Sequence, residues 1–201
     1  VSVSYLVPKN GQLSAPISPF SLRNIRLPFT NSAGIQTGGT LYIFPGLPMT
    51  DLPFESEESL RGSTFGIISP LELYLGLGSN QFKVVFSGGV FGLLFLNNRI
   101  NQGLWDQAYI DFKNWEVGNG NLELENKAGW GWTGGVSVEV PVTRQYAVAS
   151  GTSYLLGHAS NPLSGTFTGY SSAGGLVSEE LDSKGAQTSL QGIEISLGVS
   201  F

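Results

Sequence analysis

The side chains of the 201-residue chain that could most directly do chemistry lie in the stretch GHASNP at 157–162. His158 is the only histidine, and Ser160 follows it by two residues. Because side chains two residues apart share one face of an extended strand, His158 and Ser160 would lie on the same face. Histidine and serine are residue types that nucleophilic catalysis uses, so the pair is a candidate catalytic site. The alternative is that both residues merely begin a polar loop.

Charged side chains form the second candidate site. Of the 15 acidic residues, only Glu72, Glu139 and Glu194 lie within the segments that we predict below as strands. The alternation of side chains along a strand places all three on the inward face, together with Arg26 and Lys83. Because a buried unpaired charge is costly, we expect these five residues to form an interior network of salt bridges.

Composition argues against several other kinds of site. The chain has no cysteine, so it can form neither a disulfide nor a thiolate metal site. Its acidic segments do not match the spacing of an ordered cation-binding loop. The net charge of −5, with no basic cluster, argues against nucleic acid as a partner. We therefore expect no metal, no cofactor and no nucleic-acid partner.

Turn and strand signals divide the chain into alternating segments, and no long helical pattern competes with them. We predict eight strands, over 1–7, 22–29, 34–44, 64–77, 82–96, 128–140, 146–156 and 189–201. Most of these segments carry apolar side chains on one face and small or polar side chains on the other. The segment 82–96 is apolar on both faces from Val84 to Leu96, so the pattern gives no face assignment for its second half.

The predicted connections alternate in length. Short turns lie at 30–33, 78–80 and 141–145, whereas long connections fill 8–21, 45–63, 97–127 and 157–188. Short turns on one rim and long loops on the other are typical of bacterial outer-membrane barrels, in which the turns are periplasmic and the loops lie outside the cell.

Composition also bears on the fold class. Charged residues make up 12% of the chain, about half of the roughly 25% that is usual in soluble domains. No apolar run approaches the roughly 18 to 20 residues of a transmembrane helix. The sequence therefore predicts an all-β fold with a single domain over 1–201: an eight-stranded antiparallel transmembrane β-barrel. Ten strands, with an extra hairpin around Trp115 in the 97–127 connection, are the alternative.

The last strand carries the most regular pattern, GIEISLGVSF. Ile195, Leu197, Val199 and Phe201 share one face, while the other face is mostly glycine and serine. This pattern, with phenylalanine last, resembles the assembly signal of bacterial outer-membrane β-barrel proteins. The resemblance implies a Gram-negative outer-membrane location, insertion by the barrel assembly machinery and contact with outer-membrane lipid. The chain begins directly in a strand, so we interpret it as a mature form whose export signal has been removed.

The order His-x-Ser-Asn in the next-to-last predicted strand resembles the lipid A deacylase family. The resemblance implies that His158 activates Ser160 on the outside of the barrel, where acyl chains of lipopolysaccharide pass. In that family an acidic residue orients the histidine, but the corresponding region here carries Gln187 and Gln191. Pro162 also stands where the family has a small residue.

Three functions remain open. The leading hypothesis is a structural or interaction protein of the outer membrane, which presents the acidic loops at 45–63, 97–127 and 157–188 to a protein partner outside the cell. We expect it to have no large pore, because side chains fill the lumen of an eight-stranded barrel. The alternatives are an esterase that acts on outer-leaflet lipid through His158 and Ser160, and a soluble β-barrel that binds a ligand.

Overall fold

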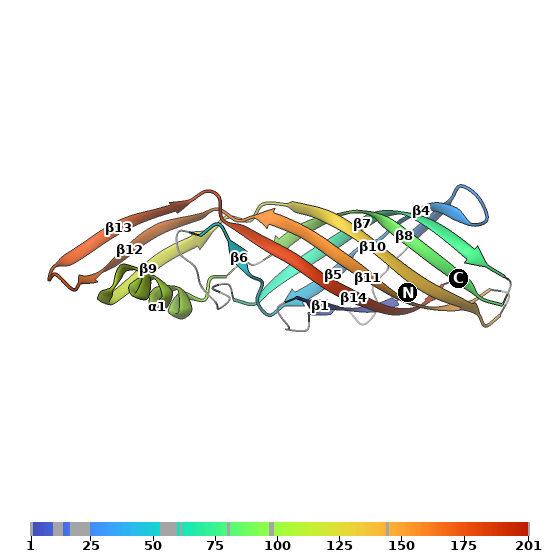
Figure 1. The fold of residues 1–201 in the computed structure, drawn as a ribbon, viewed down its shortest axis with the longest axis horizontal. Coiled ribbons are helices and arrows are strands. Elements are labelled where there is room, and N and C mark those ends of the chain that lie inside the picture. Colours follow the sequence, from blue (N-terminus) through green and yellow to red (C-terminus); the bar gives the residue numbers. More distant parts are fainter. Residues whose placement is uncertain are drawn as a thin grey trace.

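Antiparallel strands make up most of the computed structural model (Figure 1), which describes residues 2–9, 14–16, 25–52, 60, 62–79, 81–96, 99–143 and 145–200. The strands are β1 (Ser2–Pro8), β2 (Ala15–Pro16), β3 (Ile25–Pro28), β4 (Ala33–Thr37), β5 (Thr40–Phe44), β6 (Met49–Thr50), β7 (Thr64–Gly78), β8 (Lys83–Leu96), β9 (Trp115–Leu124), β10 (Gly129–Pro141), β11 (Ala147–Ser160), β12 (Leu163–Ser171), β13 (Leu176–Ser183) and β14 (Gln187–Ser200). The prediction of an all-β fold is confirmed. The expectation that no helix interrupts the strands is wrong, because α1 spans Gln102–Lys113.

Most strands belong to one large sheet with the order β1-β14-β11-β10-β8-β7. The far edge of β7 pairs with both β4 and β5, which continue to β3 and β2 respectively. Leu6 of β1 and Ser14, next to β2, exchange two backbone hydrogen bonds of 3.3 and 2.9 Å. These two bonds form an isolated bridge between β1 and the residue before β2.

A closed barrel would require the first and last predicted segments to pair, and they do so where the structure describes them. β1 and β14 are antiparallel, with Ser2 opposite Gly198 and Pro8 opposite Gly192. The predicted strand 34–44 is divided into β4 and β5, with Gly38 and Gly39 between them. Of the predicted strand 22–29, residues 25–28 form β3, and 22–24 lie outside the described residues.

The long connections at 97–127 and 157–188 are not loops, which corrects the sequence prediction. Three strands of the large sheet continue beyond it as β9, β12 and β13, which form a separate sheet with the order β13-β12-β9. This order repeats that of the strands they continue, β14-β11-β10. We call α1, β9, β12 and β13 the cap; it projects from one end of the molecule (Figure 1). β9 pairs with β12 and not in a local hairpin, so the expected hairpin around Trp115 is absent from the described residues.

The cap has its own apolar core. Trp105 and Tyr109, one helical turn apart, are the buried side chains of α1, and they pack in a cluster with Leu122 and Phe167 of the sheet. Gly118 and Gly120 make room for Phe167, because a Cβ atom at these positions would lie 2.5 and 2.8 Å from its ring. A helix that contributes only two buried side chains has a weak apolar period, which explains why sequence reasoning missed it.

The interior of the large sheet is divided into an apolar half and a polar half. The half nearer the cap holds a cluster of buried side chains: Leu6, Tyr42, Phe44, Leu47, Ile68, Phe91, Leu93, Phe95, Leu155, Ala159 and Leu190. This cluster resolves the face assignment in β8, because Phe91, Leu93 and Phe95 are buried while Leu94 and Leu96 are exposed. β8 is apolar on both faces because its inner face packs in this cluster.

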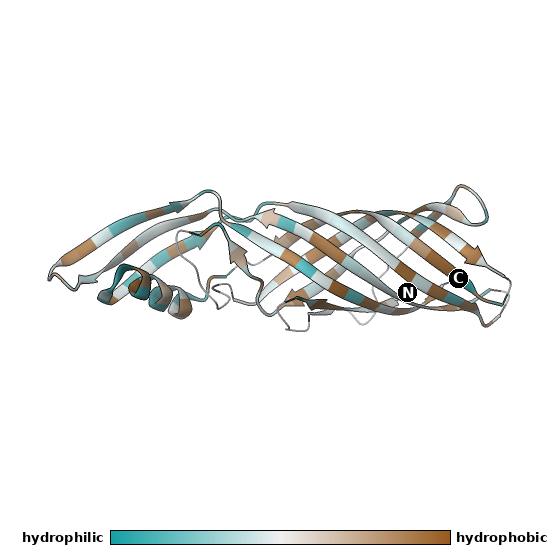
Figure 2. Cartoon of the chain, in the orientation of Figure 1, coloured by the Kyte–Doolittle hydropathy of each residue, from teal (hydrophilic) through white to brown (hydrophobic). Residues whose placement is uncertain are grey.

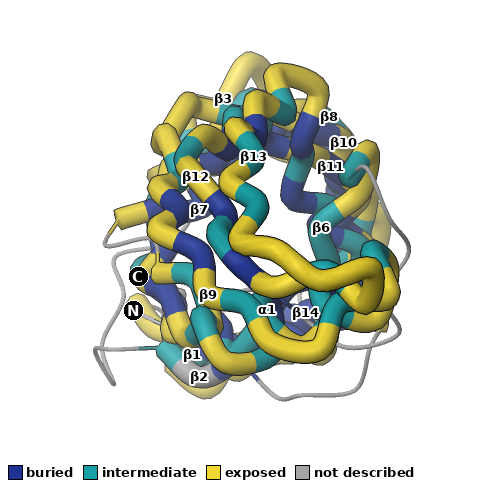
Figure 3. Tube along the Cα trace, turned by 90° about the vertical axis from the view of Figure 1, so that its left-hand side faces the viewer, coloured by how far each residue is buried: buried dark blue, intermediate teal, exposed yellow. Residues whose placement is uncertain are grey.

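Buried and exposed positions alternate along the strands when the molecule is viewed from the side of the cap (Figure 3). In β7 the side chains of Leu71, Leu73 and Leu75 are exposed, whereas Glu72 and Tyr74 are buried. Brown apolar segments recur along the strands of the large sheet in the hydropathy view (Figure 2). The large sheet therefore has an apolar outer face and an inner face on which the charged side chains of its strands lie.

Candidate functional site

His158 and Ser160 lie in β11, which extends beyond the predicted strand 146–156 and ends at Ser160. His158 is exposed on the outer face, and its ring lies 5.9 Å from the ring of Trp130 on the neighbouring strand. On the paired strand β14, Ser189 lies opposite His158 and Gln187 lies opposite Ser160. Among the described residues, no hydrogen bond joins His158 to Ser160, and no carboxylate contacts His158. The structure therefore places the two residues on one strand without assembling a nucleophile, a base and an acidic orienter.

Asn161, the last residue of the same motif, has a different role that sequence reasoning missed. Its side chain is fully buried, and its Nδ2 donates to the carbonyl oxygen of Glu125 at 3.2 Å. Its backbone N–H donates to the carbonyl oxygen of Ala186 at 2.9 Å, and Glu125 N–H donates to Pro162 at 2.9 Å. Asn161 thus joins the three places where strands leave the large sheet and enter the cap.

The interior charged residues lie in the polar half of the large sheet. Glu72 accepts hydrogen bonds from Gln36 Nε2 at 3.0 Å, Thr133 Oγ1 at 3.2 Å and Ser87 Oγ at 3.3 Å. Glu72 is buried, with 3% of its surface exposed. These three donors replace water around its carboxylate, which makes the burial of this group tolerable.

Arg26 connects Glu72 to Glu139. Its Nη2 lies 2.6 Å from Oε1 of Glu139, and its Nε donates to Oε1 of Gln36 at 3.3 Å. Its guanidinium carbon also lies 5.0 Å from the centre of the Tyr74 ring. Two hydrogen bonds and one ion pair therefore connect Glu72, Gln36, Arg26 and Glu139 in a chain across the interior.

Glu194 and Lys83, the other two predicted members of the interior network, lie apart from this chain. Glu194 accepts a hydrogen bond of 2.6 Å from the hydroxyl of Tyr42, at the border of the apolar cluster. Lys83 lies opposite Glu139 in the β8–β10 ladder, but no ion pair joins them among the described residues. Its Nζ instead donates to the carbonyl oxygen of Asn31 at 3.5 Å, the outer limit of a hydrogen bond.

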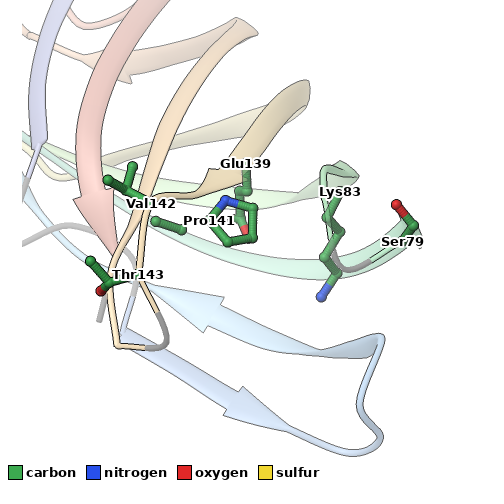
Figure 4. A pocket seen from close by; sticks show the side chains of 7 residues that line it. Ser79, Lys83, Glu139, Pro141, Val142 and Thr143 are labelled. Atoms are coloured by element: carbon green, nitrogen blue, oxygen red, sulfur yellow. The ribbon is translucent and has the colours of Figure 1, made fainter.

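A cavity of about 540 Å³ opens at the rim that carries the short turns (Figure 4). We call it the rim cavity; it is lined by Ser79, Lys83, Glu139, Pro141, Val142, Thr143 and Ala147. Further inside, a space of about 40 Å³ lies among Arg26, Gln36, Glu72 and serines of the neighbouring strands. The inner space has room for water but not for a larger solute.

The cap contains a second charged cluster. The carboxylate oxygen Oε2 of Glu179 on β13 lies 2.6 Å from Lys113 Nζ and accepts a 2.9 Å hydrogen bond from the hydroxyl of Tyr109. The hydrogen bond from Lys113, followed by that from Tyr109, lowers the pKa of Glu179. Burial, followed by the hydrogen bond to Glu179, raises the pKa of Tyr109 to about 12. Glu179 thus holds the end of α1 against the sheet.

Ile195, Leu197 and Val199 of the predicted assembly signal are exposed on the outer face of β14. Phe201, the last residue of that signal, lies outside the described residues.

Within the described residues, no group of three or more His, Cys, Asp or Glu side chains is placed to hold a metal ion. α1, the helix of the described chain, lacks the length and apolar character needed to cross a membrane.

Comparisons with known proteins show a structural likeness but no match of sequence or family. No protein-family model and no curated protein sequence matches the chain. The chain is similar in structure to the outer membrane protein OprG from Pseudomonas aeruginosa, with a TM-score of 0.45 and 10% sequence identity. That comparison covers 97% of this chain and 92% of OprG.

Proposed function

We propose that the chain is an integral protein of the bacterial outer membrane, and that its large sheet closes as an eight-stranded transmembrane barrel. The observation that carries this proposal is the apolar outer face of the large sheet. Large exposed apolar side chains lie on neighbouring strands along this face, among them Leu71, Leu73, Leu75, Leu77, Phe86, Val90, Leu94, Trp130, Trp132, Val136, Val138, Tyr154, Leu156, Ile193, Ile195 and Leu197. A patch of this extent is unfavourable in water and favourable against lipid.

The distribution of charge supports the same proposal. β7, β10 and β14 each contain one acidic residue, and these residues, Glu72, Glu139 and Glu194, are all buried. β1 contains no charged residue, and β11 contains none besides His158. A soluble protein would carry its charges on the exposed face, whereas lipid excludes them from it.

The length of the apolar band fits a bilayer. Strands tilted by about 40° advance by about 2.5 Å per residue along the membrane normal. The exposed side chains of β7 extend from Phe65 to Leu77, which at that advance corresponds to about 30 Å, the thickness of a hydrocarbon core. Trp130, Trp132 and Tyr154 near one end of the band, and Phe82 and Tyr146 near the other, are placed as interfacial aromatic belts.

The strand order supports eight positions around the barrel. β2 with β3, and β4 with β5, each occupy one position, and β1, β7, β8, β10, β11 and β14 occupy the other six. A barrel of eight strands is filled by its own side chains. The Arg26 chain and the apolar cluster occupy this interior, so we propose a barrel without a large pore.

The cap then suggests an interaction role. By analogy with barrels whose turns are periplasmic, the cap lies outside the cell and replaces flexible acidic loops with a folded surface. We propose that it presents this surface to a protein partner. We also propose that the terminal strand, through the pattern Ile195, Leu197, Val199 and Phe201, is recognised by the barrel assembly machinery.

Two matched variants test the membrane assignment. Leu73 on β7 and Val117 on β9 in the cap are both 63% exposed. An arginine on the lipid face near the membrane centre costs about 2 to 4 kcal/mol, so Leu73→Arg should sharply lower folding yield in lipid vesicles. Val117→Arg should leave that yield unchanged, because the cap is in water.

The same experiment can refute the proposal. If both variants fold equally well, and the unmodified chain stays monodisperse without detergent, then the outer face of the large sheet is exposed to water. The soluble ligand-binding alternative would then explain the chain better. The esterase alternative has less support, because no carboxylate contacts His158 among the described residues.

A further inference from the structure

The two edge strands of the cap sheet differ in how their backbone groups are satisfied. On β9, side chains of α1 take up the backbone groups of Gly120: Asp106 Oδ1 accepts its N–H at 3.0 Å, and Gln102 Nε2 donates to its carbonyl oxygen at 2.7 Å. β13, at the other border of the cap sheet (Figure 1), pairs only with β12. Within the described chain, no group outside β12 bonds to the backbone of residues 176–182. The edge of β13 is therefore open.

An open edge strand is a template for a further strand. Successive backbone groups point to opposite edges, so about half of the N–H and C=O groups of β13 face away from β12. Natural proteins protect such edges with proline, bulges or charged side chains. β13 has no proline, and its register with β12 is regular from Leu176 to Ser183. Its protection therefore rests on charge alone.

The charge of the cap is almost entirely acidic. The acidic residues of its four elements are Asp106, Asp111, Glu116, Glu123, Glu179, Glu180 and Asp182. Lys113 is the one basic residue of these elements, and it is paired with Glu179. Glu180 has no ion pair in the described chain, and Asp182 has an exposed pair with Lys184, of a kind that contributes little. Like charges on facing strands repel, so this edge disfavours a second copy of β13 and favours a basic strand.

The outer face of the cap sheet adds an apolar anchor. Val117, Tyr170 and Leu176 lie side by side across the three strands, and they are 63, 53 and 65% exposed. Leu176 is the member of this row that lies on β13. Farther along β13, on the same face, lie the exposed carboxylates of Glu180 and Asp182. A strand added to β13 therefore meets an apolar side chain at one end and two carboxylates at the other.

We propose that the open edge of β13 binds an extended basic segment of a partner protein as a fourth strand of the cap sheet. This inference rests on the proposed role of the cap as an interaction surface and specifies the chemistry of the partner. Cross-strand neighbours share a face at every second residue. The segment therefore carries a large apolar side chain opposite Leu176, and lysine or arginine opposite Glu180 and Asp182. Backbone hydrogen bonds supply the affinity, and these side chains supply the specificity.

The test uses the whole folded chain in an uncharged detergent. The probes are the peptide Leu-Val-Thr-Val-Lys-Thr-Lys and the peptide of reversed order, because a strand can add in parallel or antiparallel orientation. We expect saturable binding of at least one peptide, with slower hydrogen exchange at alternate amides of residues 176–182 and unchanged exchange in β9. The same peptide with glutamate in place of both lysines should bind more weakly.

Methylation of the peptide backbone separates strand addition from simple attraction between charges. Successive N–H groups of the bound peptide point to opposite edges, so methylation at alternate nitrogens has two forms. One form removes the donors that face β13, and the other form leaves them in place. We expect the first form to lose binding and the second to keep it, although both retain the lysines. Equal binding of the two forms would overturn strand addition.

Glu180→Lys and Glu123→Lys are matched variants, because both residues are exposed on the outer face of the cap sheet, one on each edge strand. Glu180→Lys should weaken binding of the lysine peptide by about 2- to 30-fold, since an attractive cross-strand pair becomes repulsive. It should also strengthen binding of the glutamate peptide. Glu123→Lys makes the same change of net charge and should leave both affinities unchanged. Equal effects of the two variants would overturn the assignment to β13.

Two further results would overturn the proposal. One is the absence of saturable binding of either peptide. The other is self-association of the unmodified chain that protects the amides of β13 without peptide, because a second copy would then be the occupant of the edge. The titration is done in detergent, so both results leave standing the membrane assignment, which Leu73→Arg tests separately.

Discussion

The cap should loosen as a unit when Asn161 loses its side-chain amide. In Asn161→Ala, the hydrogen bond from Nδ2 to the carbonyl oxygen of Glu125 is lost, while the backbone bond to Ala186 remains. Asn161 is fully buried, but Glu125 is exposed, so water can reach the carbonyl group that loses its donor. The loss of such a hydrogen bond costs about 0.5 to 1.5 kcal/mol.

Hydrogen exchange measures this cost directly, because opening of the cap is a local event that need not involve the large sheet. A cost of about 0.5 to 1.5 kcal/mol corresponds to about 2- to 13-fold faster exchange of cap amides. We expect this increase in peptides from α1, β9, β12 and β13, with little change in β7 and β8. The matched control is Ser160→Ala, which alters the preceding residue but removes no hydrogen bond among the described residues.

Two results would refute the reasoning about Asn161. Equal acceleration in the cap and in β7 would show that Asn161 stabilises the whole molecule and not the junction. Unchanged exchange in the cap would show that the bond to Glu125 contributes nothing to its docking.

Four further expectations follow from the other sites. Glu179 has a lowered pKa in the folded cap, so its contribution to stability is present at neutral pH and is lost as the pH falls from the ordinary value of 4.5 through the lowered one. The protection of cap amides, measured as the exchange rate relative to the intrinsic rate at each pH, should therefore decrease in acid, and Glu179→Gln should remove this dependence. Planar-bilayer recordings should show no stable large conductance steps, since the apolar cluster and the Arg26 chain fill the interior, and such steps would contradict this filling. Ser160→Ala should leave the acyl content of co-purified lipid unchanged. Lipid that loses an acyl group with the unmodified protein but keeps it with the variant would establish the esterase. Phe201→Ser should lower the amount of inserted protein in cells more than it lowers refolding into detergent, and equal losses would show that the residue acts through packing alone.

Strand content and face assignment could be predicted from the sequence because they depend on a period of two residues. The alternation of Leu71, Glu72 and Leu73 determines which side chains share a face once the segment is extended. The burial of Glu72, Glu139 and Glu194, and the pairing of β1 with β14, agree with that alternation. The alternation did not predict the partners of the charged residues. Glu194 accepts a hydrogen bond from Tyr42, and Lys83 contacts the carbonyl oxygen of Asn31 without an ion pair in the described chain. Both contacts join segments that are far apart in the sequence.

The cap and the junction depended on tertiary structure. β9 and β12 are polar and glycine-rich, and β13 is polar and acidic. All three resemble loops until Phe167 and Trp105 bring a helix and a sheet together. The motif at 157–162 determined that His158 and Ser160 share a face, but not that Asn161 would meet Glu125 and Ala186. Local spacing is set by the geometry of one strand, and so the sequence by itself determines it. Contacts between strands depend on which segments become neighbours, and only the folded chain decides that.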